Sequence, residues 1–154
     1  EEKMELTEKY KQELLNSIPV VAAMKVEIND IGDNCLTVGA PLNTNINYEG
    51  TAFGGSLNTL CILSCYLLVH HQLKSNHIEF DSLVIQNSNI DYVVPVHHDF
   101  QAKASMTDKN KALLFKMINK KGMGRVEVSS KILIEGSTDE HVNFNARFVV
   151  KKET

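Results

Sequence analysis

The sequence of 154 residues lacks several features that would assign it to a class at once. Its longest apolar run, residues 60–69, is half of the roughly 20 residues that cross a bilayer, so we expect no transmembrane helix. Internal repeats and low-complexity tracts are absent, and no secretory signal pattern opens the chain. These absences predict a cytoplasmic protein with one domain covering residues 1–154, and the hydrophobic content of 43% suffices for one core.

Positive charge is not concentrated in a stripe either. The chain carries 16 basic and 19 acidic residues, interspersed, for a net charge of −3. Phosphate-backbone contacts need clustered basic residues, so nucleic acid is not an expected partner. A few basic residues gather near two predicted turns. They could bind the phosphates of coenzyme A or an acidic carrier protein, but the favoured interpretation is that they are ordinary solvated residues at hairpin tips. They are Lys109, Lys111, Lys120, Lys121 and Arg125.

Cysteine and histidine give no sign of a metal or disulfide framework. The three cysteines are an odd number, and Cys61 and Cys65 lie one helical turn apart in an apolar run. We expect both to be reduced and buried, with a raised pKa that disfavours a nucleophilic role. The adjacent pairs His70–His71 and His97–His98 diverge in any regular structure, so no metal site is predicted.

The first half of the chain predicts a helix, a hairpin and a second helix. Residues 7–17 suit a short amphipathic helix, with Thr7 as a candidate cap and Pro19 ending it. Alternating residues at 24–31 and 35–42, separated by a Gly-Asp-Asn turn, predict a hairpin. Residues 56–74 are apolar on nearly every side until His70, so this helix must be enclosed.

The second half predicts strands separated by turn signals, which is typical of an antiparallel meander. The predicted strands are residues 83–94, 99–106, 113–119, 126–135 and 142–151. One buried helix followed by several strands fits an α+β roll or a β-grasp as well. The apolar surface all around the helix favours an antiparallel sheet that curls about it.

Two sequence phrases resemble hotdog-fold thioesterases. Residues 47–57, NYEGTAFGGSL, are similar to the phrase that precedes the central helix of that fold, with an Asn, a spaced Gly and a Gly-Gly pair. Residues 89–96, NIDYVVPV, followed by Asp99, resemble the strand after that helix, which ends with an aromatic residue and a proline. The form GTAFGGSL is closest to a small thioesterase family found alone or fused behind an acetyltransferase domain.

The resemblance implies an α+β hotdog fold that hydrolyses acyl-CoA or acyl-carrier-protein thioesters, with no cofactor beyond the coenzyme A of the substrate. It also implies a homodimer or a dimer of dimers, with the cleft between subunits. Two alternatives stay open: a hotdog module that binds an acyl thioester or fatty acid without cleaving it, and a structural or interaction module. A dehydratase is disfavoured, because that chemistry usually needs a His and an acid near the helix start.

The start of the central helix is the predicted catalytic centre. Thioester cleavage places negative charge on the carbonyl oxygen, and the first amides of a helix have no intrahelical partner. Phe53, Gly54 and Gly55 are therefore predicted to present amides to the oxyanion. By resemblance Asn47 orients the thioester or a water, although a turn residue closing its own backbone is an equal alternative. We place Thr51, in the same phrase, among the substrate-binding residues.

Two familiar catalytic positions are apolar in this sequence. Ile62 stands where many hotdog thioesterases have a carboxylate, and Phe53 stands where others have a histidine. A catalytic base must come from elsewhere, so Glu49 or Asp91 is the first candidate, although a solvated surface acid is the favoured alternative for each. The remaining polar candidates lie on the helix and on the strand that follows it. They are Asn58, Thr59, Ser64, Asn87 and Asn89.

The strand residues Asn87, Asn89 and Asp91 share one face by alternation. We expect them to form a polar row beside the helix, which either lines a wet cleft or pairs structurally with the polar helix residues. Ser64 has a competing and favoured role, in which its hydroxyl bonds back to the preceding helical turn.

Overall fold

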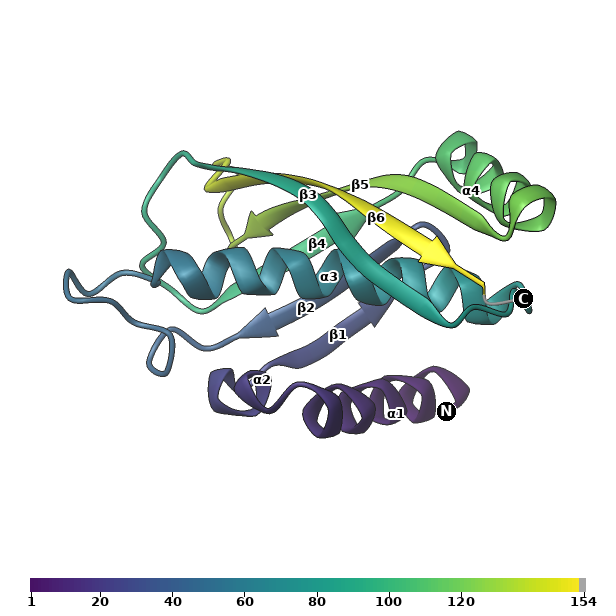
Figure 1. The fold of residues 1–154 in the computed structure, drawn as a ribbon. Helices are drawn as coiled ribbons and strands as arrows, with labels where there is room; N and C mark the ends of the chain where they lie inside the picture. The colour runs from purple at the N-terminus through teal and green to yellow at the C-terminus, as the bar shows by residue number, and fades with distance from the viewer. Residues whose placement is uncertain (153–154) are drawn as a thin grey trace.

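The computed structural model describes residues 1–152, apart from the side chain of Leu15. The elements in chain order are α1 (Glu2–Ser17), α2 (Pro19–Met24), β1 (Glu27–Ile31), β2 (Cys35–Ala40), α3 (Gly54–Ser75), β3 (Ser82–Tyr92), β4 (Phe100–Ser105), α4 (Asp108–Lys121), β5 (Met123–Leu133) and β6 (Val142–Lys151). The six strands form one antiparallel sheet that curves around α3 (Figure 1). This arrangement confirms the predicted α+β hotdog fold with a helix at its N-terminal end.

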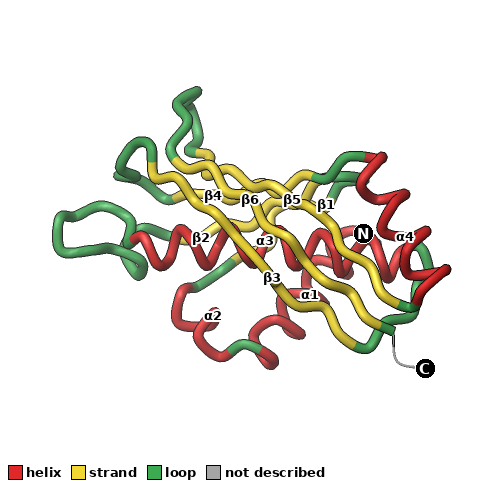
Figure 2. Tube along the Cα trace, turned by 45° about the horizontal axis from the view of Figure 1, so that its top comes forward, coloured by secondary structure: helices red, strands yellow, loops and turns green. Residues whose placement is uncertain are grey.

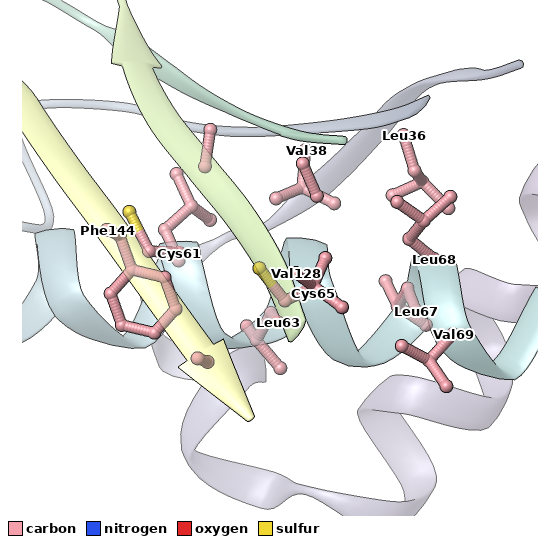
Figure 3. Close-up of a cluster of buried hydrophobic side chains, with 14 of the residues drawn as sticks. Leu36, Val38, Cys61, Leu63, Cys65, Leu67, Leu68, Val69, Val128 and Phe144 are labelled. Carbon is pink, nitrogen blue, oxygen red and sulfur yellow. The ribbon is translucent and has the colours of Figure 1, made fainter. Parts of the chain in front are cut away.

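Helix α3 lies at the centre because its side chains bury apolar surface in several directions. Leu60 and Leu68 have no exposed surface, and Cys61 and Cys65 are equally buried. Figure 3 shows side chains of α3 packed with Val38 of β2 and with residues of β5 and β6. In Figure 1, α1 and α2 lie on the opposite side of α3 from β3, β5 and β6. The helix is therefore enclosed by the sheet and partly covered by α1 and α2.

The N-terminal helix is longer than predicted. It begins at Glu2, so the expected cap at Thr7 is wrong: the Thr7 hydroxyl donates to the Lys3 carbonyl at 2.8 Å inside the helix. The predicted end is confirmed, because Pro19 is the first residue of α2, a position that needs no amide proton. The hairpin of β1 and β2 is also confirmed. Met24, predicted in its first strand, belongs instead to α2.

The predicted strand at residues 113–119 is wrong, because this segment lies in α4. The Thr107 hydroxyl caps the helix by accepting from the Asn110 amide at 3.1 Å, and Gly122 ends it with φ +71°. Leu114 and Ile118, one turn apart, bury the inner face of α4. The two turns predicted on either side of residues 113–119 are thus largely the two ends of this helix.

The sheet order differs from a simple meander. Its strands run β1-β2-β4-β5-β6-β3, so β4, β5 and β6 follow one another but β3 pairs with β6 instead of β4. Figure 2 shows β3 as the outermost strand on one side of the sheet. The chain after β3 must therefore cross the end of the sheet to reach β4. This crossing passes the start of α3, where the Ala52 amide donates to the Val96 carbonyl at 2.8 Å.

Candidate active site at the start of helix α3

Hydrogen bonds made by the side chain and the carbonyl of Asn45 hold the segment that leads into α3. The Asn45 side chain is buried and donates to the carbonyls of Met24 at 3.0 Å and Pro41 at 2.8 Å. The Asn45 carbonyl in turn accepts from the Phe53 amide at 2.7 Å. The helix start is thereby tied to α2 and to the end of β2, and is not a loose loop.

The first three amides of α3, those of Gly54, Gly55 and Ser56, have no hydrogen-bond acceptor within residues 1–152, and no side chain caps the helix. Ser56 is buried, so Gly54 and Gly55 are the candidate donors to a ligand. Phe53 does not share this property, because its amide is bonded to Asn45. The prediction of three oxyanion donors is therefore corrected to two. Both stand at the positive end of a 22-residue helix, where a developing negative charge is stabilised.

Two aromatic rings frame these amides. A Cβ at Gly55 would overlap the ring of Phe53 in its present position, so a side chain there would force this exposed ring to turn away. The Tyr92 hydroxyl donates to the Gly54 carbonyl at 3.0 Å, and its ring would lie 3.5 Å from a Cβ at Gly54. Sequence reasoning assigned Tyr92 no role in the site. The signal was present, as Tyr92 is the aromatic residue of the NIDYVVPV phrase.

Asn47 and Thr51 close the loop on itself. The Asn47 side-chain oxygen accepts from the amides of Glu49 at 2.9 Å and Thr51 at 3.0 Å, and its nitrogen donates to the Thr51 hydroxyl at 2.7 Å. These contacts give Asn47 the role of a turn residue that closes its own backbone, which was the alternative to a role in orienting the thioester or a water. Glu49 lies exposed in this loop, which projects beyond the helix start in Figure 1.

The partly exposed residues of α3 form a stripe that starts at the glycines. We define the open stripe by its members, which recur every three to four residues. They are Gly55, Asn58, Thr59, Ile62, Tyr66 and His70. The side-chain oxygen of Asn58 is buried and has no hydrogen-bond partner among the described residues. Asn58 thus offers an unused polar group one turn beyond Gly54.

Ser64 lies on the other side of α3 from the open stripe. It is fully buried against the sheet, donates to the Cys61 carbonyl at 2.8 Å, and is hydrogen-bonded to the Ser130 hydroxyl of β5 at 2.7 Å. The structure therefore does not bring it to the helix start. Its hydroxyl has the back-bonded arrangement that was the favoured alternative.

The polar row on β3 also lies away from α3. Asn87, Asn89 and Asp91 stand opposite Arg147, Asn145 and Asn143 of β6, whereas the alternate β6 residues are buried toward the helix. Residues directly opposite in an antiparallel pair project from the same face. The shared face was predicted correctly, but its expected placement beside the helix is wrong. Within one chain the row lies on the outer face of the sheet.

The two cysteines of α3 are buried as protonated thiols, which are poor nucleophiles. Burial raises the pKa of Cys61 to about 12, although a hydrogen bond with Ser130 opposes the shift, and burial also raises the pKa of Cys65. Both thiols are therefore protonated at neutral pH, and the thiolate is the nucleophilic form.

We expect iodoacetamide to leave Cys61 and Cys65 unmodified in the native protein near neutral pH. Peptide mass spectrometry should find adducts at both positions only after unfolding in guanidinium chloride, which serves as the control. An adduct at either cysteine in the folded protein would show that the helix opens toward solvent or that a thiol is activated.

Within residues 1–152, no group of three or more His, Cys, Asp or Glu side chains is placed to hold a metal ion. The same residues contain no helix that is both long and apolar enough to span a membrane.

Comparison with known proteins gives a consistent assignment. Residues 7–152 match the family described as "Putative thioesterase (yiiD_Cterm)". A protein of unknown function from Chlorobaculum tepidum is 27% identical, with a TM-score of 0.89 over 98% of this chain and 97% of that one. A putative thioesterase from Shewanella oneidensis is 26% identical, with a TM-score of 0.84 over 96% and 98%. No curated protein matches the chain.

A more distant structure shares the fold alone. The probable thioesterase from Pseudomonas aeruginosa is 14% identical, with a TM-score of 0.69 over 90% of this chain and 91% of that one. The hotdog architecture is thus retained where little sequence identity remains.

Proposed function

The chain belongs to the family described as "Putative thioesterase (yiiD_Cterm)", and from this premise we propose that it hydrolyses acyl-CoA or acyl-carrier-protein thioesters at the start of α3. The observation that carries the proposal is the pair of unpartnered amides at Gly54 and Gly55. They lie where the open stripe of α3 begins, so a thioester carbonyl can meet the amides while its acyl chain lies along the helix.

The reaction follows from this placement. Water attacks the thioester carbon, the carbonyl oxygen becomes an oxyanion that accepts hydrogen bonds from Gly54 and Gly55, and the carbon–sulfur bond then breaks. The leaving thiolate takes up the proton that the base removed from the water, so the acid and the free thiol are the products. Asn58, on the next turn of the helix, holds the attacking water once its side chain turns to expose the oxygen, which is buried and has no partner among the described residues. An amide side chain positions water but does not take its proton.

Glu49 is the proposed proton acceptor. It belongs to the loop that leads into α3, whereas Asp91 projects from the outer face of the sheet. We expect Glu49→Gln to lower kcat by about 100- to 10,000-fold with little change in KM, which is the usual range for a lost general base. Asp91→Asn is the matched control and should retain wild-type kcat. The reverse pattern would assign the base to Asp91.

The assay is release of free thiol from acyl-CoA and acyl-carrier-protein thioesters of increasing chain length. Release proportional to enzyme concentration supports the hydrolase. One observation favours a second candidate: Ile62 stands at the position where a catalytic carboxylate was expected. If no thioester is cleaved but acyl-CoA binds with a measurable Kd, the protein is a binding module that holds the thioester intact.

We further propose that two copies join through β3. This strand has 11 residues and pairs only with β6 among the described strands, so its other edge is unpaired within the chain. The side chain of Val84 in this strand is 55% exposed. Long unpaired edge strands are templates for pairing with another chain. Light scattering should give twice the 17.2 kDa chain mass, or four times that mass for a dimer of dimers. A monomer at micromolar concentration would contradict the pairing.

A further inference from the structure

The far end of the open stripe carries an aromatic cluster around His70. The His70 ring is stacked on Tyr66 with ring centroids 6.1 Å apart and meets the edges of Tyr10 and Phe80 at 5.7 Å each. A cavity of about 150 Å³ opens beside it, between α1 and α3. Its lining includes Tyr10, Glu13, Leu14, Tyr66, Leu67 and His70. This cavity is separate from the amides at the helix start.

One polar atom in the cluster has no partner. The Nδ1 atom of His70 is buried and makes no hydrogen bond among the described residues. The Tyr10 hydroxyl is already engaged, because it is hydrogen-bonded to Nδ1 of His71 at 2.9 Å. A buried ring nitrogen without a partner is costly, so such an atom usually meets a water or a ligand. Because Nδ1 is buried, a hydroxyl group in the cavity reaches it only when the His70 ring turns; the hydroxyl then donates to Nδ1 in the tautomer that carries its proton on Nε2.

The rings that line the cavity are uncharged at neutral pH. Burial lowers the pKa of His70, and Lys74 lowers it further despite the opposing effect of Glu13. Burial and Glu13 raise the pKa of both Tyr10 and Tyr66. Among the lining residues only Glu13 is an acid, so the cavity suits a neutral polar group and disfavours an anion.

The residues of the open stripe span the distance between this cavity and the helix start. His70 lies 15 residues after Gly55, which at about 1.5 Å per residue is roughly 22 Å along the helix. Thr59, Ile62 and Tyr66 lie between them on the same stripe. A long acyl chain held by its thioester at Gly54 and Gly55 would therefore end at His70.

Resting on the proposed function, we propose that the cavity beside His70 is a subsite for the far end of a long acyl chain, and that it selects chains ending in a hydroxyl group. The terminal hydroxyl donates to the His70 ring nitrogen, between the rings of Tyr10 and Tyr66. A chain ending in a methyl group leaves that nitrogen unpaired. A chain ending in a carboxylate is repelled by Glu13.

The test compares hexadecanoyl-CoA, ω-hydroxyhexadecanoyl-CoA and hexadecanedioyl-CoA. We expect kcat/KM of the wild type to be about tenfold higher for the hydroxylated chain than for the plain one, as one added hydrogen bond predicts, and lowest for the dicarboxylic chain. His70→Phe, which keeps an aromatic ring, should remove the preference without changing the rate with butanoyl-CoA, a chain too short to reach the cavity. Glu13→Gln should relieve only the discrimination against the dicarboxylic chain.

Equal rates for the plain and hydroxylated chains, or a preference that survives in His70→Phe, would overturn the subsite. A second measurement separates this outcome from failure of the hydrolase. Binding of free ω-hydroxyhexadecanoic acid and hexadecanoic acid is measured by calorimetry, with the His70 ring nitrogen followed by NMR. Tighter binding of the hydroxy acid with a shifted His70 signal supports the subsite even if no thioester is cleaved. No difference between the two acids overturns it.

Discussion

Replacing Gly54 with proline should lower kcat/KM for acyl-CoA hydrolysis by about 100- to 1000-fold, or about 2.7–4 kcal/mol, without unfolding α3. Gly54 is the first residue of the helix, a position that tolerates proline because its amide has no intrahelical partner. Phe53 before it is extended, with φ −62° and ψ 129°, as a residue before proline prefers to be. The substitution therefore removes one proposed oxyanion donor and little else.

The control for this variant is Gly54→Ala, which keeps the amide proton. Its Cβ would lie 3.5 Å from the Tyr92 ring, an ordinary contact, so we expect activity within a few-fold of wild type. Circular dichroism and thermal unfolding establish that both variants are folded. A folded proline variant with full activity would show that the Gly54 amide does not bind the oxyanion.

Replacing Leu68 with alanine should lower the free energy of unfolding by about 2–5 kcal/mol, the usual cost of removing a fully buried leucine side chain. Leu68 has no exposed surface and belongs to the core between α3 and the sheet. Because α3 has to be enclosed to bury its apolar surface, a cavity at this position weakens the whole fold. Urea unfolding monitored by circular dichroism measures the change.

The matched control is Leu113→Ala on α4, where 48% of the leucine is exposed. We expect a change within about 0.5 kcal/mol at this surface position. Equal destabilisation by the two substitutions would contradict a core centred on α3.

The central helix and its start were predictable because their signals are local. An apolar surface on all sides indicates an enclosed helix whatever surrounds it, and the Gly-Gly pair lies directly before it in the sequence. The use of the Phe53 amide by Asn45 was not predictable in the same way. That contact depends on how the loop folds back on itself, which periodicity does not report.

Helix α4 was missed although its signals were present. Thr107 and Gly122 are a typical cap and stop, and Leu114 and Ile118 have helical spacing. The meander expected from the surrounding strands outweighed them, and the two helix ends were interpreted as hairpin turns.

The sequence alone does not predict which face of the sheet carries the polar row of β3. Alternation places Asn87, Asn89 and Asp91 together, but the side on which they lie depends on pairing with β6, more than 50 residues away in the chain. The register also shifts between Ile85 and Asn87, and a shift of one residue exchanges the two faces of a strand. The side of the sheet on which the row lies, facing the helix or facing outward, is therefore known only from the folded structure.

The most direct test of the account is a crystal structure with a non-hydrolysable acyl-CoA whose thioester sulfur is replaced by a methylene group. The ketone oxygen then occupies the place of the thioester carbonyl. We expect it to lie about 2.7–3.2 Å from the amide nitrogens of Gly54 and Gly55, with the acyl chain along the open stripe. A ketone bound on the outer face of the sheet, beside Asn89 and Asp91, would contradict the account.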